Sequence, residues 1–578
     1  MSRWSALFVQ VRNVLRPWAR RSHLSSTLLA LAGYLVSMSP SLLPRSWYIQ
    51  GAVAGISALF GYAVGRLIEL AVIAVARLAE LKVTMSDTAR SLILWGWPAL
   101  LIAIVLLTPP VTVRRHQRTA EIVGTSAPTE LELLGATIFA AVVFALLMGL
   151  WQGITGLVGW ISRQLSRGRL ESRVPRWVAQ TIATVVVLSV LTFATDRFLI
   201  DPFAHRAARA AHDVNALGLS DQPPESPLRS GSPESNESWA SLGHAGRDFV
   251  TAGPTQEEIA EVTGQPAHEP IRVYAGLAGN RTLADTAAAV VAELERTGAF
   301  EREAILMLVT TGTGWVNEWV PSSFEFLTGG DSAIAAMQYS TLPSPLALLE
   351  SAALPPEAGR AMITAVEEAV NALPEDSRPR LFVSGESLGA YGANAAFESL
   401  DDLVARLDGA IFTGTPGFTP LHQKITDSRV VSSTEALPVV DDGRHVRFAS
   451  KQDELTADQW GRGLGPWEFP RVVYLQHRSD PVVWWSPELL VRSPDWLNET
   501  RLGSPAEQMS WAPFVTFWQV SADLVWAVEA PPGEGHRYAH EVVPAMAAVL
   551  GDDPDGDYSA IEAAIEAKDP TLNGESAP

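Results

Sequence analysis

Long apolar runs set the first 200 residues of the chain apart from the rest. The runs lie at about residues 24–43, 51–76, 91–108, 133–158 and 177–195. A helix needs roughly 20 apolar residues to cross the hydrocarbon core of a bilayer, so the pattern predicts five membrane-spanning helices. The first run could be taken for a signal peptide, but it lacks a clear small-x-small cleavage site and four more runs follow it. We therefore expect an uncleaved multi-pass domain over residues 1–200.

Basic residues between the apolar runs predict the orientation of this domain. Arginine and lysine are concentrated before the first run, between the second and third, and between the fourth and fifth. The positive-inside rule then places the N-terminus in the cytoplasm, and five spans place the second part of the chain at the outer face of the cytoplasmic membrane. The opposite loops carry Arg45 and the cluster Arg114, Arg115 and Arg118. That cluster opposes the assignment, and the loss of one span would reverse the compartment of the second part.

Two charged residues, Arg66 and Glu69, interrupt the second apolar run. They are three residues apart, so on a helix they share a face and can pair. Charges inside a bilayer are costly and often mark an ion or substrate pathway. The alternatives, which we favour, are an internal ion pair that stabilises the helix packing or a span that ends before Arg66.

After residue 200 the pattern changes to short apolar segments that alternate with amphipathic ones. Residues 201–245 come first and have the composition of a linker rich in Ser and Pro. Strands are expected at 271–277, 304–312, 332–340, 381–385, 409–414 and 471–476, and helices at 283–298, at 357–373 and after Ser387 through about Leu400. This alternation predicts an α/β domain over residues 246–550, with a mostly parallel sheet covered on both faces. The acidic residues 551–578 are expected to form a mostly solvated tail.

The charge balance and the absence of cysteine exclude several functions. The net charge is -20, but residues 1–200 contain 19 basic and 8 acidic residues, whereas residues 201–578 contain 24 basic and 55 acidic ones. The acidic charge of residues 201–578 argues against nucleic acid as a partner. A chain without cysteine has no disulfide, no catalytic thiolate and no cysteine-ligated metal. We expect no cofactor.

A candidate nucleophile, Ser387, directly follows one of the expected strands. Residues 381–384 suit a strand, and Gly385-Glu386-Ser387-Leu388-Gly389 comes next. Glycines on both sides of a serine permit a sharp strand-to-helix turn that exposes the hydroxyl at the N-terminus of the helix. The pattern G-x-S-x-G is common by chance. Its position between a strand and a helix is what favours a nucleophile elbow over a serine in a glycine-rich turn.

An activated serine also needs a base and a carboxylate that orients the base. In the α/β-hydrolase fold the three follow the order serine, acid, histidine. Asp480 follows the strand expected at 471–476, and His536 lies in a glycine-containing loop near the C-terminus. Their order and spacing predict a catalytic triad of Ser387, Asp480 and His536.

Other residues compete for these two roles. His540, four residues after His536, is the second candidate for the base, and His477 suits a structural or substrate-binding role better because it ends a strand. Asp441, Asp442 and Asp453 are alternative acids, although they follow no strand that the pattern predicts.

The charge that develops on a reacting carbonyl oxygen requires two hydrogen-bond donors. The backbone N–H of Leu388, directly after the nucleophile, is the first candidate. The second should come from the glycine-rich loop 311–315, which follows an early strand, and we assign it to Thr313. The alternative is a phosphate-cradling loop, but no lysine or arginine lies close by in the sequence to support it.

The chain resembles bacterial membrane-anchored α/β-hydrolases in which a multi-pass N-terminal domain precedes an extracytoplasmic hydrolase domain. The matching stretches are SPSLLPR (39–45), GRDFVTAGPT (246–255), EPIRVYAGL (269–277), TTGTGWVNE (310–318), GGDSAIAAMQYSTLPS (329–344), GESLGA (385–390), VVYLQHRSDPVVWW (472–485) and GEGHRYAHE (533–541). The resemblance implies the fold and the triad of Ser387, Asp480 and His536. At Glu386 the family pattern leads us to expect an apolar residue, so an acidic side chain there could disfavour an anionic substrate.

These residues predict a membrane-bound serine hydrolase. Attachment to the bilayer favours acyl esters of lipids or of the cell envelope as substrates. Tryptophans could line an acyl pocket or belong to the core: Trp467, Trp484, Trp485, Trp511 and Trp518. An acyltransferase or a peptidase would use the same triad. A non-catalytic transport or scaffolding protein with a vestigial hydrolase domain is the third possibility, and Arg66 and Glu69 are its only support.

Overall fold

The computed structural model describes residues 24–80, 87–166, 175–195, 197–198, 215, 222–277, 281–499 and 503–568. The chain divides into two compact units, and each is described by itself. The helical unit comprises Met1–Arg197, Pro487–Leu497 and Arg501–Trp526. The sheet unit comprises Phe198–Ser486, Asn498–Thr500 and Ala527–Pro578.

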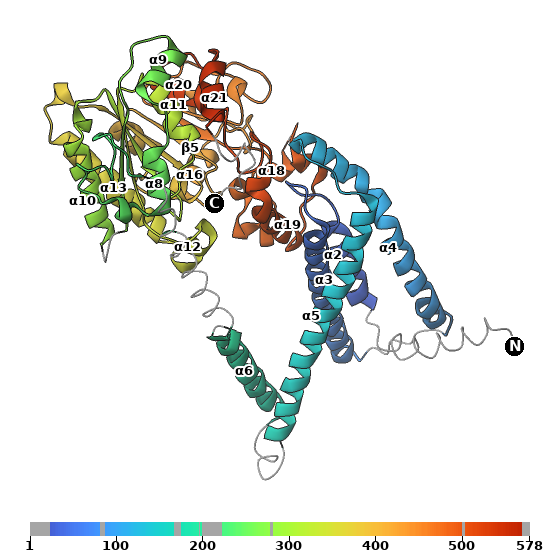
Figure 1. Ribbon diagram of the computed structural model, residues 1–578. Helices are drawn as coiled ribbons and strands as arrows, with labels where there is room; N and C mark the ends of the chain where they lie inside the picture. The colour runs from blue at the N-terminus through green and yellow to red at the C-terminus, as the bar shows by residue number, and fades with distance from the viewer. Residues whose placement is uncertain are drawn as a thin grey trace. The chain divides into compact units, whose positions relative to one another are not determined.

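The first part of the chain is helical, as the apolar runs predict. Its helices are α2 (Leu24–Ser37), α3 (Trp47–Leu78), α4 (Asp87–Val123), α5 (Glu130–Leu165) and α6 (Arg176–Thr195) (Figure 1). Three helices in the described part are long and apolar enough to cross a membrane: Trp47–Leu78, Glu130–Leu165 and Trp177–Thr195. These suggest association with a membrane.

The expectation of five spans is not confirmed. Helix α2 has 14 residues, so it is only about 21 Å long against a hydrocarbon core of about 30 Å. It ends at Ser37 because Pro40 and Pro44 follow, and proline cannot continue a helix. The third run, 91–108, belongs to α4, which continues through the polar Arg114 cluster to Val123 and is not among the three candidates.

Arg66 and Glu69 do pair, with 2.8 Å between Nη1 and Oε2. Both lie within α3, which continues past them to Leu78. The pair is partly exposed at the helix surface.

A segment that follows the candidate acid in the sequence packs into the helical unit. Asp523 ends α19 (Val515–Asp523). Its Oδ2 accepts hydrogen bonds from Ser41 Oγ and from the Leu42 N–H, and its Oδ1 lies 3.3 Å from Arg45 Nε. The side chains of Arg45 and Asp523 are 1% and 0% exposed, so this is a buried ion pair.

Replacing Asp523 with Ala should destabilise the helical unit by about 3–5 kcal/mol, because the Arg45 guanidinium would be left buried without its counter-ion. Thermal unfolding of the detergent-solubilised protein measures this. Glu69→Ala is the matched control, since it breaks a partly exposed pair that contributes about 1 kcal/mol or less. Equal midpoints for the two variants would contradict the burial of the Arg45–Asp523 pair.

Among the described residues, the sheet unit is built on seven parallel strands. They are β1 (Ile271–Ala275), β2 (Ala304–Val309), β3 (Ser332–Met337), β4 (Arg380–Glu386), β5 (Gly409–Thr413), β6 (Val446–Ala449) and β7 (Arg471–Leu475), in the order β1-β3-β2-β4-β5-β7-β6. Every adjacent pair runs parallel, which confirms the expected type of sheet. Of the strands in the described part of the chain, only β6 was not predicted from the sequence.

Two hydrophobic cores cover the two faces of this sheet. Alternate side chains of β2 point to opposite faces, with Ile305 in one core and Leu306 in the other. Helices α10 (Leu283–Arg296) and α13 (Leu354–Asn371) pack on the first face, and α11 (Trp319–Leu327) and α20 (Val542–Leu550) on the second (Figure 1). Both expected helices before Ser387 are present.

The strand order reverses between β2 and β4. From β2 the chain continues to β3 on one side, and the later strands lie on the other side. Val309 and Gly385, near the carboxyl ends of β2 and β4, are register partners. In open α/β sheets such a reversal creates a crevice at the carboxyl ends of the strands, where ligands bind. The loops after β2 and β4 are the two that carry Thr313 and Ser387.

Within the described residues, stretches of the segments expected as linker and tail pack against the sheet unit. Ser230 and Glu237 are buried, and Glu293 of α10 accepts hydrogen bonds from Ser230 Oγ, Ser235 Oγ and the Asn236 N–H at 2.7–2.8 Å. The polar composition of this segment therefore wrongly suggests an unstructured linker. Hydrogen bonds to one buried carboxylate hold it in place without the burial of apolar side chains. In the C-terminal region, α21 (Ser559–Glu566) buries Ile565 in the second core.

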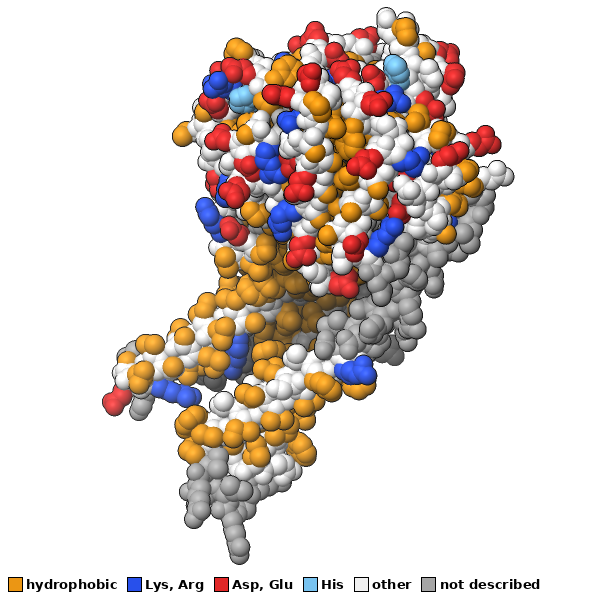
Figure 2. Space-filling model, turned by 90° about the vertical axis from the view of Figure 1, so that its left-hand side faces the viewer, with side chains coloured by type: hydrophobic (Ala, Val, Ile, Leu, Met, Phe, Trp, Pro, Cys, Tyr) orange, Lys and Arg blue, Asp and Glu red, His pale blue; other side chains and the backbone are white. Residues whose placement is uncertain are grey.

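The surfaces of the two units differ in kind. Charged side chains of both signs are spread over the sheet unit, whereas the helices of the first part present mainly apolar side chains (Figure 2). Large exposed apolar residues of α3 and α5 include Leu67, Val75, Leu146 and Leu150. That surface fits the apolar helices identified by length and composition.

Candidate active site

Ser387 occupies a strained turn between β4 and α14 (Leu388–Asn394). Its φ of 55° and ψ of -123° are rare for a residue with a side chain. A Cβ at Gly385 would lie 2.5 Å from the Gly389 carbonyl carbon, and one at Gly389 would lie 2.1 Å from Val309 O. Both glycines are therefore required for the turn. The Ser387 N–H donates to Thr413 O at 3.1 Å, which ties the turn to the end of β5.

Asp480 and His536 lie in direct contact. The His536 Nδ1–H donates to Asp480 Oδ2 at 2.7 Å. Asp480 follows β7, is 0% exposed, and also accepts hydrogen bonds from the Val482 N–H at 2.8 Å and from Tyr538 OH at 2.8 Å. A carboxylate held in this way orients an imidazole and stabilises its protonated form.

The other ring nitrogen of His536 is available for chemistry. Nε2 is buried and has no hydrogen-bond partner among the described residues. The ring lies over Gly414, where a Cβ would be 2.3 Å from Cε1. Gly414 directly follows Thr413, whose carbonyl holds the Ser387 N–H. Ser387 and His536 are thus both held at the end of β5. No hydrogen bond joins Ser387 Oγ to Nε2 in the described structure, and such bonds often form only when substrate binds.

Adding a methyl group at Gly414 should displace the His536 ring. We expect Gly414→Ala to lower kcat/KM roughly 100-fold, since a shift of about 1 Å in a catalytic group has an effect of this size. Gly298→Ala is the matched control. Gly298 also has a positive φ, 70°, but its Cβ would meet nothing within 4 Å. Equal activity of the two variants would contradict the effect expected from the close approach of Gly414 to the His536 ring.

A buried acid, Glu386, lies next to the candidate nucleophile. Its Oε2 accepts hydrogen bonds from Asn317 Nδ2 at 2.7 Å and from Thr413 Oγ1 at 3.0 Å. Burial raises the pKa of Glu386, against the opposing effect of His536 and of these two donors. Burial lowers the pKa of His536, but Asp480 and Glu386 outweigh it, so the pKa of His536 lies above its ordinary value.

Glu386→Gln should move the acid limb of the kcat/KM profile to lower pH. A general base acts in its neutral form, so activity rises as pH increases through the raised pKa of His536. An amide can still accept the hydrogen bonds of Asn317 and Thr413 but carries no charge that raises this pKa. Profiles of wild type and variant between pH 5 and 9 measure the shift. An unmoved acid limb would contradict the electrostatic role of Glu386.

The two candidate oxyanion donors lie at the ends of adjacent strands. Leu388 is the first residue of α14, and Thr313 lies in the turn after β2. The turn is held by Tyr274 OH, which donates to Gly314 O at 3.0 Å, and by Gln338 Nε2, which donates to Thr313 O at 2.8 Å. No backbone carbonyl among the described residues accepts a hydrogen bond from the Thr313 N–H, so its role as the second donor stays a prediction.

The remaining candidates for base and acid lie elsewhere. His540 is partly exposed and lies 3.6 Å from Glu562, not beside Asp480. Asp441 and Asp442 lie in the short turn η5 (Asp441–Gly443). Asp453 follows the unpredicted strand β6 and pairs with Lys451 at 2.9 Å. His477 is buried three residues before Asp480.

The five tryptophans expected near an acyl pocket have different positions. Trp467 lies under the guanidinium groups of Arg447 and Arg471, at 4.3 and 5.3 Å. Trp484 is buried and donates to His477 O at 2.9 Å. Trp511 and Trp518 belong to the helical unit. Trp485 packs edge-on against Phe418, with 6.1 Å between ring centroids.

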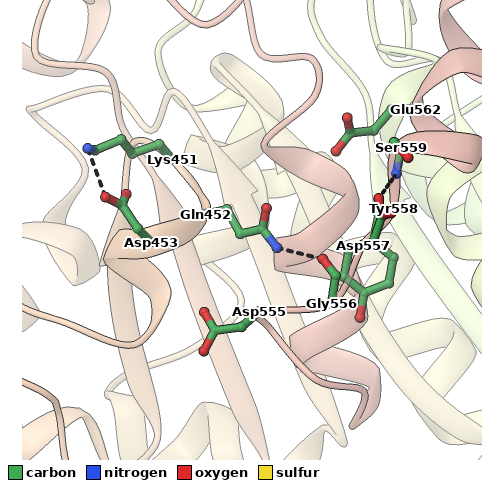
Figure 3. A pocket seen from close by; sticks show the side chains of 9 residues that line it. All are labelled: Lys451, Gln452, Asp453, Asp555, Gly556, Asp557, Tyr558, Ser559 and Glu562. Atoms are coloured by element: carbon green, nitrogen blue, oxygen red, sulfur yellow. Dashed lines mark hydrogen bonds and ion pairs between the residues drawn. The ribbon is translucent and has the colours of Figure 1, made fainter.

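A hollow on the sheet unit includes none of Ser387, Asp480 and His536, and most of the charged residues that line it are acidic. Figure 3 shows its lining, in which Lys451 pairs with Asp453 and Gln452 donates to Gly556 O at 2.9 Å. Asp557 accepts from the Ser559 N–H at 3.0 Å. Across the residues that the structure describes, no group of three His, Cys, Asp or Glu side chains could hold a metal ion.

Several residues around the site were missed from the sequence. Tyr538 and Asn317 connect its parts: Tyr538 OH donates to Asp480, and Asn317 Nδ2 donates both to Glu386 and to Tyr538 O at 3.0 Å. Glu541 accepts from His477. None of these residues belongs to a sequence motif with a known role. Only their closeness in sequence to His536 or to the loop after β2 could have drawn attention to them.

Fold and site together define a chain of α/β-hydrolase type, and the comparisons with known proteins agree. A model described as the alpha/beta-hydrolase family matches residues 271–561, and a model described as the N-terminus of that family matches residues 38–254. The chain belongs to the alpha/beta-hydrolase family, which confirms the resemblance. No curated protein and no solved structure gives a significant match.

Proposed function

We propose that this protein is a membrane-bound serine hydrolase that cleaves acyl esters. Ser387 is the nucleophile, His536 the base and Asp480 the orienting acid. The observation that carries the proposal is the 2.7 Å contact between Asp480 and His536, with Nε2 buried and unpartnered among the described residues, at the same end of β5 as the strained turn of Ser387. Membership of the alpha/beta-hydrolase family also supports a hydrolase-type function.

The geometry suggests a mechanism in two half-reactions. Ser387 Oγ attacks the ester carbonyl carbon while His536 Nε2 takes the hydroxyl proton. The N–H groups of Leu388 and Thr313 stabilise the negative oxygen. The tetrahedral intermediate collapses, the C–O bond to the alcohol breaks, and His536 returns the proton to the departing alcohol. A water molecule, deprotonated by His536, then releases the acid and regenerates Ser387.

The apolar helices of the first part support a membrane location. The distribution of basic residues favours the cytoplasmic membrane of a bacterium, with the sheet unit on the outer side. An enzyme held at a bilayer meets lipid and cell-envelope esters more readily than diffusing metabolites. We therefore propose such acyl esters as the substrate class.

Acyl transfer is the second candidate, and the burial of His536 favours it. The residue is only 8% exposed, and a site that excludes water lets an alcohol compete for the acyl-enzyme. The transport or scaffolding alternative gains nothing from Arg66 and Glu69, which pair with each other on one helix.

Ester turnover in the presence of alcohol acceptors tests the proposal. Detergent-solubilised protein is supplied with 4-nitrophenyl esters of acyl chains from two to twelve carbons, with and without glycerol. Release of nitrophenol with free acid as the product supports hydrolysis. Glyceryl ester as the main product supports transfer, and no turnover of any ester by folded protein would contradict both.

A further inference from the structure

A second histidine, His477, lies three residues before Asp480 and forms hydrogen bonds through both of its ring nitrogens. Its side chain is 1% exposed. Nδ1 lies 2.9 Å from Gly535 O, and Nε2 lies 2.7 Å from Glu541 Oε1. The ring stacks on Tyr538 with 4.1 Å between centroids and 11° between planes.

These partners determine where the protons lie. A backbone carbonyl only accepts, so Nδ1 must carry a hydrogen. Nε2 faces a carboxylate oxygen, and a lone pair on both atoms would repel. One further proton therefore lies between Nε2 and Oε1, and the buried pair of His477 and Glu541 is held together by it.

The pair holds the chain on both sides of His536. Gly535, whose carbonyl His477 binds, directly precedes the base. Tyr538, on which His477 stacks, follows it by two residues and accepts a hydrogen bond from the His477 N–H at 3.2 Å. The Tyr538 hydroxyl in turn donates to Asp480 Oδ2. Ser479 Oγ adds a hydrogen bond from the Gly535 N–H at 2.8 Å.

We propose that the His477–Glu541 pair is a positioning device for the catalytic base: the shared proton fixes the Gly535 carbonyl and the Tyr538 ring, and so directs His536 Nε2 toward Ser387. This inference rests on the proposed hydrolase function. Neither residue touches the reacting atoms. They act by raising the fraction of enzyme molecules in which His536 Nε2 is oriented toward Ser387.

The pair also predicts that the enzyme loses activity at high pH. The titratable groups that face it are Glu541, Asp480, His536, Tyr538 and Glu534. Burial lowers the pKa of His477, but Glu541, the Gly535 carbonyl and Asp480 outweigh it, so the pKa lies above its ordinary value. A raised histidine pKa stabilises the fold below the unfolded value of about 6.5, and that contribution is lost as pH rises through the folded value. The base should then lose its alignment.

Three variants test the proposal. His477→Phe keeps a ring on Tyr538 but loses both hydrogen bonds, and we expect kcat to fall roughly 10- to 100-fold with KM unchanged. Glu541→Gln keeps a hydrogen bond to a neutral imidazole and has no shared proton to lose, so the alkaline limb of kcat should disappear. His422→Phe is the control, because His422 is also buried but bonds the Gln476 side chain at 3.1 Å and neither Gly535 nor Glu541, the partners of the His477 ring. It should lower the thermal midpoint and leave kcat unchanged.

Wild-type kcat in folded His477→Phe, or an alkaline limb that persists in Glu541→Gln, would overturn the positioning role. Failure of the proposed function has a different signature. A fluorophosphonate would then not label wild-type Ser387, while the thermal midpoint would still report on the pair. A midpoint that falls with rising pH in wild type but not in Glu541→Gln supports the shared proton, and identical pH dependence overturns it.

Discussion

Ser387→Ala should lower kcat for ester hydrolysis by roughly 10⁴- to 10⁶-fold, because no other group replaces the attacking oxygen and the remaining catalysis comes from the oxyanion donors and binding. KM should change little, since alanine is smaller than serine and the turn is retained. The rate is measured with the best ester of the chain-length series under single-turnover conditions.

Ser384→Ala is the matched control for this variant. Ser384 lies three residues earlier on β4, is buried, and has a hydroxyl without a hydrogen-bond partner among the described residues. Removing that hydroxyl should leave kcat within about twofold of wild type, because replacing an unsatisfied polar atom costs little. A large loss in Ser384→Ala, or a small one in Ser387→Ala, would contradict the assignment of the nucleophile.

Asp480→Asn should lower kcat by roughly 10⁴-fold with the fold intact. An amide near Nδ1 favours the tautomer in which Nδ1 has no hydrogen, so Nε2 carries one and cannot act as a base. The double variant with Ser387→Ala should be no slower than Ser387→Ala alone, because residues that act as a unit are not additive.

Asp458→Asn controls for the loss of a buried carboxylate. Asp458 accepts hydrogen bonds from the Trp460 and Arg462 N–H groups at 2.9 Å and pairs with the Arg462 side chain, so its partners are none of the candidate site residues. It should lower stability without a change in kcat. If Asp480→Asn loses less than about tenfold in kcat, another acid orients the base.

The regular part of the sheet unit could be predicted from the sequence because its signals are local. The strand before Ser387 is apolar, glycines flank the serine, and the helix that follows begins at Leu388, as the elbow requires. The strand β6 was missed because it has only four residues, VRFA, and a charged residue within it. Arg447 is buried there through hydrogen bonds to backbone carbonyls such as Leu455 O.

Long-range contacts account for most of what the sequence did not reveal. Nothing near Asp523 indicates that its carboxylate bonds Ser41 and Leu42, which precede it by more than 480 residues. The network of His477, Tyr538 and Glu541 is of the same kind. The short helix α2 differs, because Pro40 and Pro44 already argue against a continuous helix over 24–43.

The central claim is that Ser387 is activated by His536, and covalent labelling tests it most directly. Detergent-solubilised wild type, Ser387→Ala and His536→Ala are treated with a fluorophosphonate, and the labelled peptide is identified by mass spectrometry. Our account predicts an adduct on Ser387 in wild type, none in Ser387→Ala, and strongly slowed labelling in His536→Ala. An adduct on a different serine, or no adduct on folded wild type, would contradict it.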